Sequence, residues 1–302
     1  MVLLSDYRLS VFEKNLGVYG IHVYQNGKTL AEHRFRSNDR ENLYSASKTF
    51  VSVGIGIAES EGRFLLSDYV LDFFPEYKDI AYLGSEKITI RHLLQMSSGH
   101  MFEDFSQYNS KDRAELFFIS EMKQAAGSNF YYEDLCTYML GRLVEKVSGK
   151  IVLDYLKPRL FDMLEIVNPQ WNTCQHGHTS CSGGLYLNTE EFSRIGITLL
   201  QNGVYKDKQI VPADYINLLH SDWVDTTSKN DSETKGGYGY QVWKCTPPNT
   251  YRADGMYGQL CVVLTDYNAV ITVTSHNEIE HKDILRAMWS DILPNLQDKK
   301  RS

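Results

Sequence analysis

Strand-like runs stand at both ends of this chain with helical segments between them, and this arrangement constrains the fold more than any other feature. Val18–Tyr24 and Thr29–Phe35 flank Asn26-Gly27, the dipeptide that most strongly marks a β-hairpin. The runs near the other end are rich in Val, Ile, Tyr and Trp. They span Gly239–Cys245, Gln259–Thr265 and Ala269–Ser275. We therefore expect strands from both termini to form one layer.

The segments between the runs predict helices. Ser45–Gly62 is mostly apolar, too long for one strand and closed by glycine, which indicates a buried helix. A short helix is expected ahead of the hairpin, and longer ones at Ile90–Met96, Arg113–Ala126, Leu135–Val147, Glu190–Asn202, Pro212–Ser221 and Ile279–Leu293. The expected fold class is α/β (α+β), an antiparallel sheet with terminal helices. Its α/β subdomain spans about residues 1–75 and 185–302, with an all-helical subdomain inserted at about 76–184.

Composition narrows the function classes. The 302 residues include 31 basic and 38 acidic side chains, and a net charge of -7 disfavours nucleic acid or an anionic membrane as partner. The sequence contains neither a signal-peptide-like nor a membrane-spanning apolar run. Five cysteines at irregular spacing predict reduced thiols. We expect a cytoplasmic protein that acts on a small molecule without a cofactor.

Ser45-Ala46-Ser47-Lys48 has the Ser-x-x-Lys spacing, which places two side chains one turn apart on one helix face. A serine hydroxyl needs a nearby group to take its proton, and a lysine in an apolar pocket can be neutral enough to help. The backbone N–H groups at the start of a helix can also stabilise an oxyanion. These features make Ser45 a candidate nucleophile.

The spacing alone does not decide the matter. It recurs at Ser120–Lys123 and Ser232–Lys235, although both copies lie in polar surroundings. Ser45 is also interpretable as a helix N-cap, with Lys48 as a solvated residue of the first turn. The segments around Ser45 are needed to distinguish these alternatives.

The region from Leu43 to Tyr77 resembles the opening of the serine β-lactamase and penicillin-binding protein superfamily. In that superfamily a Ser-x-x-Lys helix precedes a glycine turn and a stretch like Leu66–Val70 here. Ile88–Leu94, running on to Ser97-Ser98-Gly99, looks like a second landmark. The resemblance implies a β-lactamase/transpeptidase-like fold and a nucleophilic Ser45 assisted by Lys48.

Phe130–Asp134 is similar to the second catalytic motif of the class C β-lactamase branch, Tyr-x-Asn. Tyr132 stands at the catalytic tyrosine position, which implies proton exchange with the nucleophile and the leaving group. The third position is Asp134 instead of asparagine, so a substrate-facing amide has become a carboxylate that only accepts hydrogen bonds when ionised.

The third motif of the superfamily is Lys-Thr-Gly or His-x-Gly, and its best match here is Ala253-Asp254-Gly255. Alanine stands where the carboxylate-binding cation is usual, and Arg252 should point to the opposite face because side chains alternate along a strand. Arg252, Asp254 and Gly255 remain substrate-binding candidates. The resemblance implies that the N–H groups of Ser45 and Met256 form the oxyanion hole.

Ser182–Tyr186 and Gly237–Trp243 extend the likeness over about residues 10–290, nearest to the esterase and amide-hydrolase members. That side of the superfamily includes 6-aminohexanoate-dimer hydrolase and family VIII carboxylesterases. The implied activity is cleavage of an amide, ester or peptide through an acyl-enzyme on Ser45. Specificity is expected to lie in the loops Phe102–Asp112 and Asp225–Gly237.

Two alternatives stay open. Cys174, His176, His178 and Cys181 have zinc-ligand chemistry, so a metallohydrolase is one of them. The other is a catalytically weak or inactive binding module, suggested by Asp134 and by the altered third motif. The joint presence of Ser45, Lys48 and Tyr132 argues against the inactive module.

Overall fold

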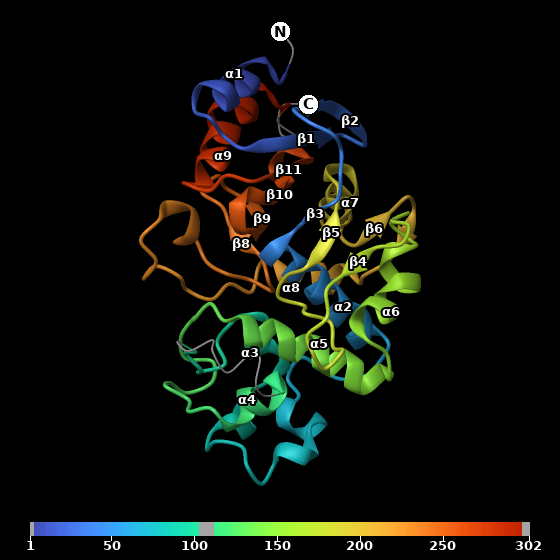
Figure 1. The fold of residues 1–302 in the computed structure, drawn as a ribbon, viewed down its shortest axis with the longest axis vertical. Helices are drawn as coiled ribbons and strands as arrows, with labels where there is room; N and C mark the ends of the chain where they lie inside the picture. The colour runs from blue at the N-terminus through green and yellow to red at the C-terminus, as the bar shows by residue number, and fades with distance from the viewer. Residues whose placement is uncertain (1–2, 103–111, 298–302) are drawn as a thin grey trace.

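A six-stranded antiparallel sheet joins the two ends of the chain (Figure 1). The structure, a computed structural model, describes residues 3–102 and 112–297. The strand order is β2-β1-β11-β10-β9-β8, so the N-terminal hairpin pairs with the C-terminal strand β11. The strands are β1 Val18–Gln25, β2 Lys28–Arg34, β8 Trp243–Lys244, β9 Thr250–Gly255, β10 Gln259–Leu264 and β11 Ala269–Ser275. The predicted layer of strands from both termini is confirmed.

The central strands are apolar on both faces because helices cover both sides of the sheet. Every residue of β10 and β11 is buried, whereas the edge strand β2 is mostly exposed. Leu260, Val262 and Leu264 of β10 pack toward one core, and the intervening Cys261 and Val263 pack toward the other. The period of two along β10 therefore serves two hydrophobic cores.

Helices α1 Ser5–Glu13 and α9 Lys282–Ala287 lie together on one face of the sheet, near both termini (Figure 1). Helix α7, Thr189–Leu200, packs on the other face against β10 and β11. Its start is held by a capping box between Asn188 and Glu191. The larger core continues from α7 into α2, Ser47–Ser60, which is buried from Ser47 to Ala58.

Among the described residues, five α-helices and two small sheets remain. Figure 1 shows α3, α4 and α5 grouped at the end of the molecule opposite the termini. The other helices are α3 Ile90–Leu94, α4 Arg113–Ile119, α5 Asp134–Ser148, α6 Val152–Leu156 and α8 Ala213–Leu219. Two small sheets are formed by β3 Glu41–Asn42, β5 Leu185–Leu187 and β4 Gln170–Trp171, and by β6 Val204–Tyr205 and β7 Lys208–Gln209. The sequence reasoning did not predict the small sheets or α6.

Three predicted elements differ most from the structure in length. Helix α4 ends at Ile119 instead of Ala126, because the N–H groups of Lys123 and Gln124 donate to the carbonyl of Gly99. The expected strand Gly239–Cys245 shrinks to β8, since Gln241 has φ of 62°, which breaks an extended run. The last helix is α9 followed by a π-helical turn, Met288–Ile292, and a 3-10 turn that contains Pro294.

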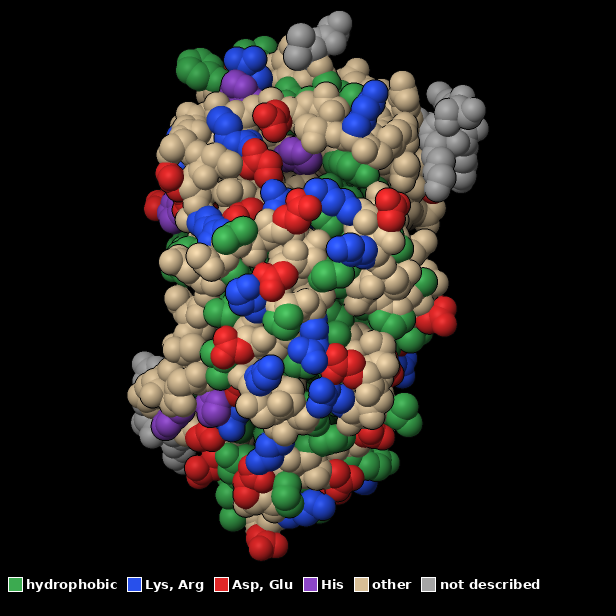
Figure 2. Space-filling model, turned by 90° about the vertical axis from the view of Figure 1, so that its right-hand side faces the viewer, with side chains coloured by type: hydrophobic (Ala, Val, Ile, Leu, Met, Phe, Trp, Pro, Cys, Tyr) green, Lys and Arg blue, Asp and Glu red, His purple; other side chains and the backbone are tan. Residues whose placement is uncertain are grey.

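The surface carries charged side chains of both signs (Figure 2). Figure 2 shows one face on which Lys and Arg side chains are interspersed with Asp and Glu. Ion pairs between such side chains include Arg40 with Glu191 at 2.5 Å and Arg159 with Glu61 at 2.6 Å. Within residues 3–102 and 112–297, each helix is too short or too polar to cross a bilayer.

Candidate active site

Ser45 lies in a 3-10 turn, Tyr44–Ala46, that leads directly into α2. Tyr44 has φ of 46°, a left-handed conformation that turns the chain from β3 toward the helix. The Tyr44 N–H donates to Asn42 Oδ1 at 2.9 Å, and the Ala46 N–H donates to Leu43 O at 3.0 Å. The turn therefore holds the Ser45 hydroxyl at the N-terminal end of a buried helix.

Lys48 is buried beside Ser45, with only 1% of its side chain exposed. Its Nζ donates to Ser45 Oγ at 2.9 Å and to the backbone oxygen of Ser182 at 2.8 Å. The same nitrogen is ion-paired with Asp134 Oδ1 at 2.8 Å. An ammonium has three N–H donors, and here each has an oxygen partner.

The environment of Lys48 keeps its side chain charged. Burial alone would lower the pKa of Lys48, but the neighbouring Tyr132 and Asp134 outweigh burial, and the pKa is raised. This result differs from the expectation that an apolar pocket makes the lysine partly neutral. The reason is the combined effect of Tyr132 and Asp134, and the Asp134 carboxylate lies at the start of α5, where the helix dipole also favours negative charge.

Tyr132 approaches the same ammonium from the segment before α5, with Lys48 Nζ 5.1 Å from its ring centroid. Its ring stacks on Trp243 at 5.7 Å and meets the edge of Tyr238 at 5.9 Å. Burial raises the pKa of the Tyr132 phenol, although the charge of Lys48 and hydrogen bonding to Ser45 and Lys48 act in the opposite direction. At neutral pH the site thus holds a neutral phenol next to an ammonium.

Strand β9 brings the third motif against the nucleophile turn. A Cβ on Gly255 would lie 2.2 Å from Leu43 O and 3.2 Å from Ala46 N, so only glycine permits this approach of the two backbones. Met256 follows directly and is 55% exposed. The backbones that carry the Ser45 and Met256 N–H groups therefore run side by side.

Arg252 and Asp254 do not join this cluster. Arg252 is completely buried, its Nε donates to Asp254 Oδ2 at 2.7 Å, and its NH1 group lies 3.5 Å from Cys245 Sγ. Asp254 also lies 3.7 Å from His281 Nε2. Because side chains alternate along β9, both residues face away from the side of Ala253 and Gly255. This placement agrees with the expected direction of Arg252, and a substrate-binding role for Arg252 and Asp254 stays a prediction.

Comparison with known proteins identifies the family. The family model described as Beta-lactamase matches residues 12–289. This chain belongs to the beta-lactamase family. Among curated relatives, it is 24% identical over 250 residues to the 6-aminohexanoate-dimer hydrolase of Paenarthrobacter ureafaciens, a match over 74% of this chain and 63% of that protein. The chain thus spans less than two thirds of that relative's length.

Solved structures share the beta-lactamase fold with this chain. The octameric penicillin-binding protein homologue from Pyrococcus abyssi superimposes with a TM-score of 0.77 at 17% identity, covering 98% of this chain and 77% of that one. The D-stereospecific amidohydrolase from Streptomyces sp. gives a TM-score of 0.72 at 17% identity, covering 94% of this chain and 98% of that one. At these identities the likeness concerns the fold.

Sequence reasoning missed two parts of this beta-lactamase family site. The Ser182 carbonyl accepts a hydrogen bond from Lys48, but the segment Ser182–Tyr186 was given no role in the sequence analysis. A backbone oxygen cannot be recognised from the residue type that carries it. Trp243 and Tyr238 hold the ring of Tyr132, but they were noted only as part of a matching stretch. Only spatial contact reveals either role.

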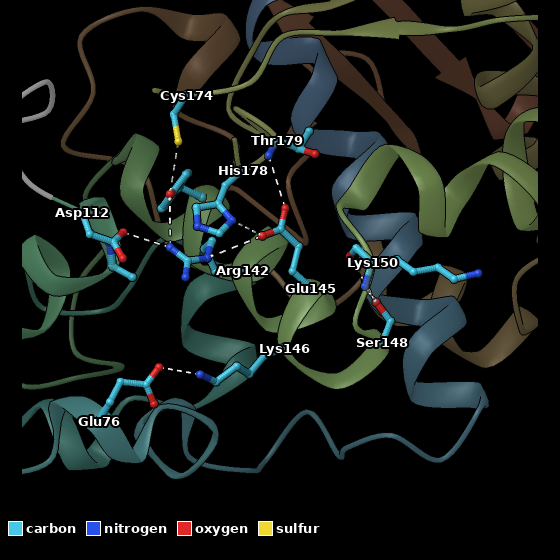
Figure 3. Close-up of polar contacts among 12 residues, drawn as sticks. Glu76, Asp112, Arg142, Glu145, Lys146, Ser148, Lys150, Cys174, His178 and Thr179 are labelled. Carbon is cyan, nitrogen blue, oxygen red and sulfur yellow. Dashed lines mark hydrogen bonds and ion pairs between the residues drawn. The ribbon is translucent and has the colours of Figure 1, made fainter. Parts of the chain in front are cut away.

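The four residues with zinc-ligand chemistry lie elsewhere and do not converge. His178 Nδ1 pairs with Glu145 Oε2 at 2.6 Å, and Cys174 Sγ lies 3.7 Å from the Tyr138 hydroxyl, so both side chains point toward α5 (Figure 3). Cys181 is buried against Gly141 of α5, because a Cβ added to that glycine would lie 2.1 Å from Cys181 Sγ. Residues 3–102 and 112–297 contain no group of three or more His, Cys, Asp or Glu arranged to hold a metal ion.

Proposed function

We propose that this beta-lactamase family member is a serine hydrolase that cleaves an amide or ester through an acyl-enzyme on Ser45. The observation that carries the proposal is the Lys48 ammonium, which binds Ser45 Oγ at 2.9 Å and lies 5.1 Å from the ring centroid of Tyr132. A nucleophile, a cation and a phenol are thereby collected at one helix start. The name of the 6-aminohexanoate-dimer hydrolase, an amide hydrolase, agrees with this reaction class.

In the first step, Ser45 Oγ attacks the carbonyl carbon and forms a new C–O bond. The hydroxyl proton passes to the phenol oxygen of Tyr132, while the phenol proton passes to the leaving nitrogen or oxygen as its bond to carbon breaks. This relay uses the neutral phenol that the raised pKa favours. The Lys48 ammonium stabilises the negative charge that develops on both oxygens.

In the second step, water attacks the acyl-enzyme and Ser45 leaves. The proton of the water passes to Tyr132 as the phenol returns a proton to Ser45 Oγ, so the site regains its starting state. In both steps the N–H groups of Ser45 and Met256 are proposed to stabilise the carbonyl oxygen. Gly255 supports this role because it permits the close approach of their backbones.

Replacing Ser45 with alanine tests the proposal. We expect Ser45→Ala to reduce hydrolysis of p-nitrophenyl butyrate to the background rate, because no acyl-enzyme can form. A fluorophosphonate should add its mass to the wild-type protein and not to the variant, as measured by intact mass spectrometry. Ser120→Ala is the matched control, since Ser120 belongs to another Ser-x-x-Lys copy and bonds the Leu116 carbonyl at the end of α4.

The same experiment tests the inactive-module alternative. A binding module should show neither ester turnover nor labelling by fluorophosphonate or a fluorescent penicillin. Labelling that persists in Ser45→Ala would move the nucleophile to another residue and contradict the proposal. Tyr132→Phe is expected to lose on the order of a hundredfold or more in kcat/KM because it removes the group that exchanges protons. Lys48→Ala is expected to lose about as much because it removes the charge that stabilises the developing oxyanions.

A further inference from the structure

Two charged side chains lie at the proposed nucleophile, and they differ in accessibility. The side chain of Lys48 is 1% exposed, whereas that of Asp134 is 46% exposed, although both share the same Nζ–Oδ1 contact at 2.8 Å. The carboxylate is therefore the solvent-accessible member of the ion pair that contacts Ser45.

Lys48 has no N–H group left for a substrate. Its oxygen partners, Ser45 Oγ, Ser182 O, Asp134 Oδ1 and the Tyr132 hydroxyl, already outnumber its three N–H donors. The charge of the ammonium is also offset by the adjacent carboxylate. A substrate carboxylate near the scissile bond would have to displace one of these partners and approach Asp134 at the same time.

The third motif supplies no further cation to this side of β9. Position 253 is an alanine with 2% exposure, and Arg252 is committed to Asp254 on the opposite face. In the part of the chain that the structure describes, the other cation at the aromatic cluster around Tyr132 is Lys229, whose Nζ lies 5.6 Å from the Phe130 ring, which lies 6.5 Å from the Tyr132 ring. Lys229 is therefore the competing recognition group that a test must separate from Asp134.

Aromatic rings also lie next to Ser45 in the chain. Tyr44, directly before Ser45, meets Tyr257 edge-on at 5.2 Å, and Tyr257 stacks on His276 at 4.1 Å. Tyr44 and Tyr257 are both partly exposed. His276 is paired with Glu278 at 3.2 Å. Aromatic faces of this kind attract organic cations.

We propose that Asp134 makes the site select acyl groups with an ammonium, or with no charge, near the scissile carbonyl and reject those with a carboxylate there. The inference rests on the proposed function, because it names the substrate class of the same site. It concerns the acyl side, since the acyl group stays bonded to Ser45 beside the Lys48–Asp134 pair. Carboxylate-bearing acyl groups are the poor substrates of this class.

Three esters of matched length test the proposal: the 4-nitrobenzyl esters of 3-aminopropanoate, butanoate and hydrogen succinate. Their acyl chains end in an ammonium, a methyl and a carboxylate, and chromatography measures the released 4-nitrobenzyl alcohol. We expect kcat/KM to fall in that order, with at least about a tenfold difference between the ammonium and carboxylate esters.

Two variants assign the preference. Asp134→Asn keeps the shape and removes the charge, so the ammonium-to-carboxylate ratio of kcat/KM should fall toward one, whatever happens to the overall rate. Lys229→Ala, the matched control, should keep the wild-type ratio. A preference for the carboxylate ester, an unchanged ratio in Asp134→Asn, or a ratio set by Lys229 would each overturn the inference while leaving the serine mechanism intact. Absence of Ser45-dependent turnover with all three esters would instead overturn both proposals.

Discussion

Asp134 changes the electrostatic environment that the Tyr-x-Asn motif creates around Lys48 and Tyr132. The sequence indicated only that a carboxylate replaces an amide at the third position of Tyr-x-Asn. In the structure that carboxylate lies 2.8 Å from Lys48 Nζ and raises the pKa of the lysine against the effect of burial. It also contributes to raising the pKa of Tyr132. A carboxylate in place of an amide therefore adds to the upward pKa shifts of two neighbouring groups.

The pH dependence of hydrolysis tests this coupling. The proposed relay needs a charged Lys48 and a neutral Tyr132, so kcat/KM should fall as pH rises through their raised pKa values. Asp134→Asn removes the negative charge that raises both values, so the alkaline fall should move to lower pH. The measurement is the profile of kcat/KM for p-nitrophenyl butyrate across the neutral and alkaline range. An alkaline limb that stays in place, or moves to higher pH, would contradict the coupling.

At the scale of elements, Ser45 and Lys48 are held in place by α2, whose stability depends on close packing because its helix propensity is weak. It contains two glycines, and each interior glycine costs a helix about 1 kcal/mol relative to alanine. A Cβ on Gly56 would lie 2.5 Å from the Tyr215 ring, whose hydroxyl in turn donates to Ser52 O at 2.7 Å. Close contact between α2 and α8 thus compensates the weaker helix propensity.

Gly56→Ala tests this packing. We expect it to lower the free energy of unfolding by about 1–3 kcal/mol, because the methyl group meets a ring that is held by its own hydrogen bond. Gly54→Ala is the matched variant: its Cβ would meet Leu156 Cδ2 at 3.1 Å, and this flexible side-chain end can rotate away. Urea denaturation should separate the two variants. Equal stability of Gly56→Ala and Gly54→Ala would show that the Tyr215 contact does not constrain α2.

At the scale of the whole molecule, Gln241 connects segments that the sequence assigned to different subdomains. Its backbone oxygen accepts from Thr49 Oγ1 of α2 at 2.9 Å, and its side-chain oxygen accepts from Thr137 Oγ1 of α5 at 2.6 Å. Its amide nitrogen donates to the Leu94 carbonyl of α3 at 2.8 Å. The large core likewise contains residues from both predicted subdomains, for example Val263 and Leu140. We therefore expect the two parts to unfold together.

Calorimetry of Gln241→Ala tests this connection. The wild-type protein should unfold in one transition, and the variant should lose about 1–3 kcal/mol because the Thr137 hydroxyl and the Leu94 carbonyl lose a buried partner. Gln201→Ala removes one hydrogen bond, from the side-chain amide of Gln201 to the Tyr24 hydroxyl at 2.9 Å in a partly exposed position. It should lower the free energy of unfolding by less. Two separate transitions in the wild type would contradict cooperative unfolding of the subdomains.

The sequence by itself determined much of the architecture of this beta-lactamase family member. The hairpin at Asn26-Gly27, the buried helix α2 and the strands β10 and β11 follow from local signals: a turn dipeptide, a long apolar run and β-branched residues. Such signals act within a few neighbouring residues, so a linear pattern is sufficient. The three-residue spacing that brings Ser45 and Lys48 together is also a local signal.

The tertiary structure alone decided which charges meet. Tyr132, Asp134 and Ser182 come from distant segments, and no local pattern states that all three lie around Lys48 Nζ. The burial of Arg252 against Asp254 is also a tertiary result, because β9 lies between β8 and β10 and has one face turned away from the nucleophile. Electrostatic interactions depend on distance in space and on exclusion of water, and folding sets both only when remote segments pack together.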